Sequence, residues 1–150
     1  MPAPKFSRRS YYNGAQEHLA LALRLREGGE HFAAHYFAGV AVESILRALS
    51  TEDDQTFDGT HDIKQWAKKS GLLPNNPSNQ SEFVAKFHET NLRWRANQRY
   101  YTVKMLDTWL YHLNIDGSVK GDRVKVSTER MLELANDIVK RGVLKCKNRF

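Results

Sequence analysis

The sequence predicts an all-α protein, folded as an antiparallel up-and-down bundle of four to five helices. Apolar residues recur at helical spacing in several separate segments, and segments rich in glycine, proline and asparagine divide them. No run alternates apolar and polar residues for long enough to predict a strand. Because 150 residues, 41% of them hydrophobic, suit one core, we expect a single domain over 1–150. Its core is expected at about 11–142, with basic tails at 1–9 and 143–150.

The first helix is expected at about 10–26. Tyr12 and Leu19 belong to an apolar series at helical spacing, and a pair of glycines at 28–29 supplies a stop. The next segment, about 31–49, contains no proline and is apolar on nearly every side. A helix of that kind is covered by neighbours on more than one side, so we expect it to be the central helix of the bundle.

Further helices are expected along the rest of the chain, separated by exposed loops at about 51–59, 73–81 and 114–125. A short helix should be capped by Thr60 and end at Gly71, and its inward face should carry Ile63, Trp66 and Ala67. The others are expected at about 82–95, at about 102–113, and from near Ser127 to a C-cap at Gly142.

The chain is basic, with 23 Lys and Arg against 17 Asp and Glu and a formal net charge of +6. Such a charge favours phosphate-bearing partners, but much of the excess lies near the two ends, where it can serve solubility alone. Both interpretations stay open. One cysteine, Cys146, and the absence of a long apolar segment lead us to expect a cytoplasmic protein with no membrane association.

The common catalytic signatures are missing from the sequence, including the phosphate-binding loop, the dinucleotide-binding glycine pattern and the His-Glu-x-x-His zinc helix. His31 and His35 have the spacing at which two imidazoles can share a metal, but Glu30 is the only further ligand nearby. Two polar residues on the first turn of the central helix are the more ordinary interpretation. We therefore expect no metal site and no cofactor.

Two segments carry candidate binding residues. Glu43 interrupts the apolar central helix, and Arg47 lies one turn further on the same side, so the pair is either an internal ion pair or a ligand-facing one. The segment 91–101 contains three Arg, one Trp and two Tyr. That mixture can stack bases and neutralise phosphates, although the ends of amphipathic helices show the same residues.

Taken together, these segments resemble the bacterial and archaeal HEPN domains. The stretch 35–48 reads HYFAGVAVESILRA, His-Asp-Ile follows at 61–63, and Trp94 precedes an Arg-Tyr pair at 99–100. In that family a helix of the type A-x-Y-x-A-G-x-A-x-E-x-x-L-K-A is followed by H-D-L and later by W-x-x-x-x-R-Y. The stretch ANDIVKRG at 135–142 is similar to the family's closing helix, and the resemblance covers about 11–142.

The resemblance implies a helical bundle that pairs into a homodimer and is often encoded beside a minimal nucleotidyltransferase, as in toxin–antitoxin pairs. Many members are metal-independent ribonucleases, in which an Arg and a His separated by four to six residues meet at the dimer cleft. In this sequence that spacing occurs only where Arg26 or Arg24 precedes His31, across the pair of glycines. At the family's catalytic place the sequence has Arg99 and no histidine before His112.

Because the histidine of the catalytic Arg–His pair is missing at that place, we expect a non-catalytic homodimer that binds a nucleotide or RNA. The residues expected to border its pocket are Glu43, Arg47, His61, Asp62, Trp94, Arg99 and Tyr100. Two alternatives stay open: a metal-independent endoribonuclease of the toxin type that uses Arg26 and His31, and a structural dimerisation partner of a nucleotidyltransferase.

Overall fold

The computed structural model describes residues 5–51, 55–56, 61–73, 82–117 and 121–148. The described part of the chain is all-α, as predicted, and its only strands are two-residue segments that pair antiparallel. The helices are α1 (Arg8–Glu27), α2 (His31–Ser50), α3 (Ile63–Ser70), α4 (Glu82–Arg93), the 3-10 helix η1 (Ala96–Tyr100), α5 (Val103–Leu113) and α6 (Arg123–Lys147), and the strands are β1 (Lys5–Phe6) and β2 (Gln55–Thr56).

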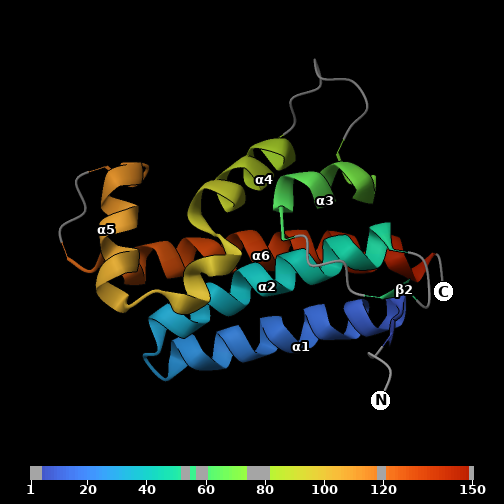
Figure 1. Cartoon of the computed structure of the whole chain (residues 1–150), viewed down its shortest axis with the longest axis horizontal. Helices are drawn as coiled ribbons and strands as arrows, with labels where there is room; N and C mark the ends of the chain where they lie inside the picture. Colours follow the sequence, from blue (N-terminus) through green and yellow to red (C-terminus); the bar gives the residue numbers. More distant parts are fainter. Residues whose placement is uncertain (1–4, 52–54, 57–60, 74–81, 118–120, 149–150) are drawn as a thin grey trace.

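Three long helices, α1, α2 and α6, lie side by side, while α3 and α4 cover one side of them and α5 stands across one end (Figure 1). Helix α1 runs antiparallel to both of its long neighbours. Helices α2 and α6 run in the same direction, since His35 contacts Ser127 and Ile45 lies against Gly142. The chain returns between them through α3, α4 and α5, so these two helices are neighbours in space but not in sequence.

Helix α2 is the centre of the core, and the prediction that it is covered on more than one side is confirmed. Twelve of its 20 residues are buried, including Val42, Ile45 and Leu46 with no exposed surface. Helices α1, α3 and α6 cover different faces of it. Truncating such a buried aliphatic side chain to alanine typically costs about 2–5 kcal/mol of stability, so the apolar pattern of this one helix carries a large share of the fold.

The expected boundaries of the last helix, Ser127 and Gly142, are wrong at both ends. Helix α6 begins at Arg123, where the Asp122 side chain accepts hydrogen bonds from the first backbone amides, and it runs to Lys147. Gly142 therefore lies inside the helix and does not end it. A Cβ at this position would come within 2.3 Å of Cγ1 of Ile45 on α2. The glycine therefore allows α6 to approach α2 closely. The core also extends past the expected limit at 142, since Cys146 is buried.

Other boundaries differ by a few residues. Asp62 caps α3, and Thr60, the expected cap, lies outside the described residues. The end of α3 at Gly71 is as predicted, with a left-handed φ of 76°. Helix α4 stops at Arg93 and gives way to η1. Among the described helices, none is both long and apolar enough to cross a lipid bilayer.

Candidate functional site

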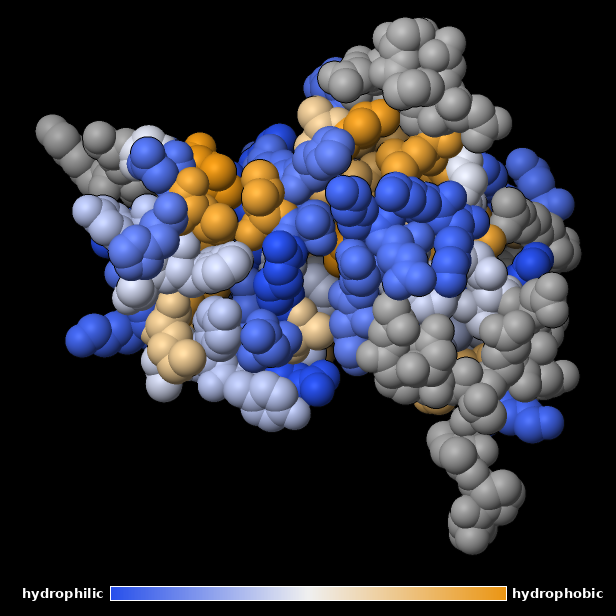
Figure 2. Space-filling view, turned by 45° about the horizontal axis from the view of Figure 1, so that its top comes forward, coloured by the Kyte–Doolittle hydropathy of each residue, from blue (hydrophilic) through white to orange (hydrophobic). Residues whose placement is uncertain are grey.

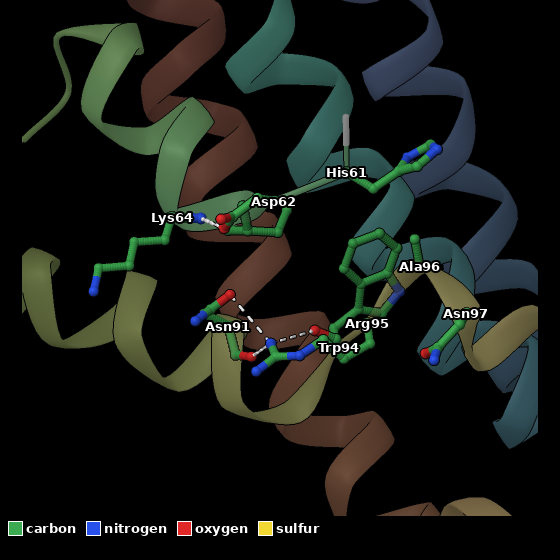
Figure 3. Close-up of a pocket in the computed structure, with 9 residues that line it drawn as sticks. His61, Asp62, Lys64, Asn91, Trp94, Arg95, Ala96 and Asn97 are labelled. Carbon is green, nitrogen blue, oxygen red and sulfur yellow. Dashed lines mark hydrogen bonds between the residues drawn. The ribbon is translucent and has the colours of Figure 1, made fainter. Parts of the chain in front are cut away.

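A cavity of about 450 Å³ opens where the start of α3 meets the end of α4 and η1 (Figure 3). Its walls combine two cationic side chains, two amides, a histidine, a carboxylate and a few apolar groups. The lining residues are His61, Asp62, Ile63, Lys64, Asn91, Trp94, Arg95, Ala96 and Asn97. The volume lies within the range of small-ligand sites, and the mixture of cations and amides suits an anionic, hydrogen-bonding ligand.

Trp94 forms a wall of this cavity and anchors the end of α4 to α2. Its side chain is only 1% exposed, and its Nε1–H donates a hydrogen bond to the carbonyl of Tyr36 at 3.0 Å. The indole lies directly on Gly39, where a Cβ would come within 2.1 Å of the ring. Trp94 thus lines the cavity, but its buried ring offers little surface on which a base could stack.

Arg95 brings a positive charge to the cavity wall. Its Nη1 group donates to the carbonyl of Asn91, to the Asn91 side-chain oxygen at 3.2 Å and to the carbonyl of Trp94 at 3.2 Å. These acceptors lie at the C-terminal end of α4, where carbonyls lack helical partners, so the guanidinium acts as a helix cap. Among the described residues no carboxylate pairs with it, and its charge stays available to a ligand.

Asp62 and Lys64 form the opposite wall. The Asp62 carboxylate accepts a hydrogen bond from the backbone amide of Lys64 at 3.0 Å and one from the amide of Gln65 at 3.4 Å. This capping and the positive end of the helix dipole offset the negative charge of Asp62. The side chain of Lys64 is exposed and has no carboxylate partner within the described part of the chain.

Glu43 is held by an arginine and a histidine behind the cavity. Its Oε1 accepts a hydrogen bond from Nδ1 of His61 at 2.8 Å and one from Nη2 of Arg47 at 3.4 Å. Burial raises the pKa of Glu43, and the charges of His61 and Arg47 counteract that shift. The guanidinium of Arg47 is itself buried and lies 4.3 Å from the ring centre of Trp66. Of Glu43, Arg47 and His61, only His61 lines the cavity. Glu43 and Arg47 therefore form an internal ion pair on α2.

Arg99 and Tyr100 lie on η1 and do not belong to the cavity wall. Both are exposed, and the guanidinium lies 4.8 Å from the centre of the Tyr100 ring. Hydrogen bonds to Tyr100 and Tyr36 raise the pKa of Arg99, which keeps it cationic. Tyr36 also receives the hydrogen bond of Trp94, so the exposed pair and the cavity wall adjoin the same residue of α2.

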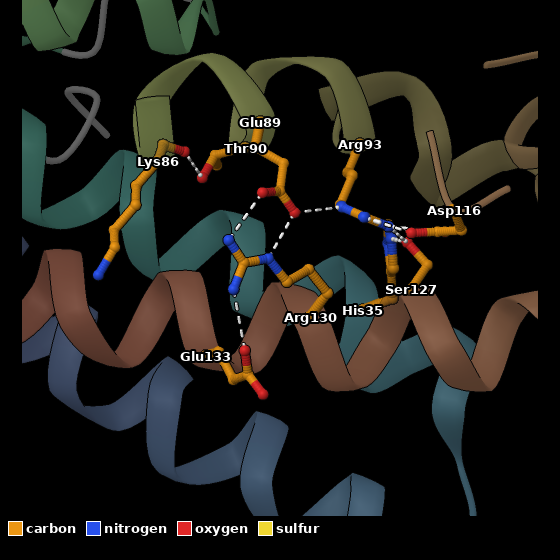
Figure 4. Close-up of polar contacts among 9 residues, drawn as sticks. All are labelled: His35, Lys86, Glu89, Thr90, Arg93, Asp116, Ser127, Arg130 and Glu133. Atoms are coloured by element: carbon orange, nitrogen blue, oxygen red, sulfur yellow. Dashed lines mark hydrogen bonds and ion pairs between the residues drawn. The ribbon is translucent and has the colours of Figure 1, made fainter. Parts of the chain in front are cut away.

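Sequence reasoning missed a buried polar network around Arg93 (Figure 4). Its guanidinium donates to Glu89 at 2.8 Å, to Asp116 at 2.5 Å and to Oγ of Ser127 at 3.1 Å. Glu89 also accepts two hydrogen bonds from Arg130 of α6. The network connects α4 with α6 and with the segment after α5. The one signal in the sequence was the helical spacing of Glu89 and Arg93.

His35 belongs to the same network and is neutral. It is fully buried, and its Nε2 shares a hydrogen bond of 3.0 Å with Ser127. Burial, together with the charge of Arg93, lowers the pKa of His35 to about 3. His35 therefore connects α2 to α6. Within the described ranges, no three side chains among His, Cys, Asp and Glu gather as metal ligands would.

Arg26 and His31, the candidate catalytic pair of the ribonuclease alternative, lie at the turn between α1 and α2. Nη1 of Arg26 pairs with Glu129 of α6 at 3.1 Å. The backbone carbonyl of His31 accepts a hydrogen bond from Thr128, and its Nδ1 atom is buried. Both residues thus take part in contacts that attach the turn to α6.

Comparison of the chain with protein-family models, with curated proteins and with solved structures finds no significant match. The function of the cavity is therefore inferred from its own chemistry. Three of the predicted residues, His61, Asp62 and Trp94, line it. Lys64, Asn91, Arg95 and Asn97 were not predicted, because they converge on the cavity from segments up to 33 positions apart in the sequence.

Proposed function

We propose that the protein is a HEPN-like module that binds a nucleotide or RNA as a homodimer and does not catalyse a reaction on it. The observation that carries this proposal is the cavity of about 450 Å³ with Lys64 and Arg95 on opposite walls. Neither cation is matched by a carboxylate partner among the described residues. An anionic ligand would supply the missing charge, and phosphate accepts the several hydrogen bonds that a guanidinium can donate.

The remaining walls suit the other parts of a nucleotide. The amides of Asn91 and Asn97 can both donate and accept, as recognition of a base edge or a ribose requires. His61 is oriented by Glu43 and adds a further polar group. Outside the cavity, the exposed ring of Tyr100 provides a stacking surface next to the charge of Arg99.

The contacts of Arg26 favour binding over ribonuclease activity. A catalytic arginine must reach the charge that develops on the phosphorane, but this guanidinium is engaged by Glu129. Cleavage of RNA without added metal that is lost in His31→Ala would support the alternative of a toxin-type endoribonuclease.

The proposed homodimer has a candidate surface in the groove between α1 and α6. The groove is apolar, has a volume of about 490 Å³ and is lined in part by Leu144, which is 65% exposed. The two helices run antiparallel. We propose that a two-fold axis over this groove brings Leu144 of each copy against Leu19 and Leu23 of the other. We propose that this dimer is cytoplasmic, because the chain has one cysteine, Cys146, which is buried, and therefore no disulfide within the chain that would require an oxidising compartment.

Titration of ATP, GTP and a short RNA, followed by calorimetry, tests the binding proposal. Lys64→Ala should weaken binding about tenfold or more, since a charge-assisted hydrogen bond contributes about 1.5–3 kcal/mol. Arg99→Ala should weaken RNA binding as well. Lys125→Ala, an exposed substitution on α6, is the matched control and should change nothing. Absence of binding in the wild type, or equal binding in all variants, would contradict the proposal.

A further inference from the structure

A second, smaller hollow of about 120 Å³ adjoins the cavity along the α3–α4 pair. The two spaces share the side chains of Lys64 and Asn91, which stand at their common boundary. The lining residues of the second hollow are Lys64, Ala67, Lys68, Leu73, Val84, Phe87, His88 and Asn91. One elongated site thus consists of two compartments with a lysine and an amide between them.

The second compartment differs chemically from the first. Its walls are mainly apolar, with Phe87 buried behind them, while Lys68 and His88 are exposed at its rim. An apolar space beside an imidazole suits a planar aromatic ring, because unstacked bases pack on aromatic side chains, histidine included. Its volume of about 120 Å³ is well below the roughly 450 Å³ of the first cavity, which suits one small ring system.

Two lysines on the solvent-facing side of α3 lie along this elongated site. Lys64 and Lys68 are one helical turn apart, about 6 Å along the helix axis, and both side chains are exposed. The solvent-facing side of α3 is a broad hydrophilic surface (Figure 2). No carboxylate pairs with either lysine in the described segments. A ligand that lies along α3 would therefore meet one positive charge at the boundary and another at the far rim.

We infer that the ligand is a single-stranded oligonucleotide of at least two nucleotides, with one base in each compartment and the linking phosphodiester between Lys64 and Asn91. The inference rests on the proposed function and adds the length and placement of the ligand. A mononucleotide would fill only the larger cavity and would leave Lys68 and His88 without contact. A second nucleotide joins both compartments, and its backbone neutralises the boundary lysine.

Binding of 5′-AMP, of a 5′-phosphorylated dinucleotide ApA and of a tetranucleotide A4, each as ribose and deoxyribose forms, tests the inference in one calorimetric series. The dinucleotide should bind about tenfold or more tightly than 5′-AMP, because it adds one stacked base. From two to four nucleotides the gain should be smaller. Either sugar supports the inference, and tighter binding of the ribose form would assign a contact to the 2′-hydroxyl group.

Single substitutions separate the two compartments. Lys68→Ala and His88→Ala should each weaken binding of the dinucleotide several-fold and leave the affinity for 5′-AMP as it is. Lys64→Ala should weaken both ligands, and Lys125→Ala neither. Equal affinity for 5′-AMP and the dinucleotide overturns this inference alone, as does an equal loss of both ligands in the Lys68 and His88 variants. If none of the ligands binds, the proposed function fails as well.

Discussion

The contact between Gly39 and Trp94 makes a sharp prediction about stability. In Gly39→Ala the new Cβ would lie 2.1–2.3 Å from three atoms of the indole ring, which is rigid and enclosed. The ring must move, and its hydrogen bond to the carbonyl of Tyr36 is then weakened. Overpacking costs about 1–3 kcal/mol and a lost hydrogen bond about 1 kcal/mol, while alanine in a helix regains about 1 kcal/mol over glycine. The net loss should be about 2 kcal/mol.

The matched control is Gly14→Ala in α1, where the new Cβ meets only the His18 ring, at 3.9 Å. Here the helix-propensity gain stands alone, so stability should rise by up to about 1 kcal/mol. For a chain of this size 1 kcal/mol corresponds to a shift of about 2–4 °C in Tm. Thermal unfolding followed by circular dichroism should therefore place the two variants on opposite sides of the wild type.

A double variant isolates the cause. When Trp94→Ala has removed the indole, Gly39→Ala should become neutral or stabilising, so the two substitutions should be strongly non-additive. The reasoning is refuted if Gly39→Ala is as stable as Gly14→Ala. It is also refuted if Gly39→Ala costs the same with and without the indole, because the glycine would then matter for something other than this contact.

Two further predictions concern the buried histidine and the dimer. The pKa of His35 in the native state is about 3, below its ordinary value of 6.5. As the pH falls from 6.5 towards 3, His35 therefore becomes protonated in the unfolded chain but stays neutral in the native state, which favours unfolding. The contribution of His35 to the free energy of unfolding should therefore be complete above pH 6.5 and decline through this interval. Urea unfolding at several pH values should show a weaker decline of this free energy in His35→Gln than in the wild type. The same pH dependence in both proteins would exclude His35 as the cause. If the protein forms the proposed homodimer, Leu144→Asp should convert it to a monomer in sedimentation experiments, while Tyr111→Asp, an exposed site on α5, should leave it paired. A monomeric wild type would contradict the proposed groove.

Most of the fold could be predicted because apolar spacing directly encodes which helix faces are buried. The central helix and the end of α3 at Gly71 follow from such local signals. Gly142 misled the prediction, because a glycine that ends a helix and one that admits a neighbouring helix look the same in a sequence. Only the position of Ile45, far away in the chain, distinguishes them.

The candidate site was predictable only in part, for a related reason. Arg93, Arg95 and Arg99 are close in sequence, yet the first lies in a buried network, the second lines the cavity and the third is exposed. The helical period breaks where α4 gives way to η1, so the direction of each side chain could not be derived from spacing. The pairing of Glu43 with Arg47 was local and predictable, whereas its bond to His61 depends on tertiary structure.

The parallel packing of α2 and α6 has a consequence for how the chain folds. Helices α1 and α2 are joined by a short turn and can meet early, but α6 can dock only after residues 51–122 have been accommodated. Contacts that distant along the chain slow folding, since loop closure comes before the stabilisation that it allows. We expect amides of α1 and α2 to gain protection from hydrogen exchange ahead of those of α6. Until α6 docks, one apolar face of α2 is exposed to solvent, and during this interval the chains are most prone to aggregate.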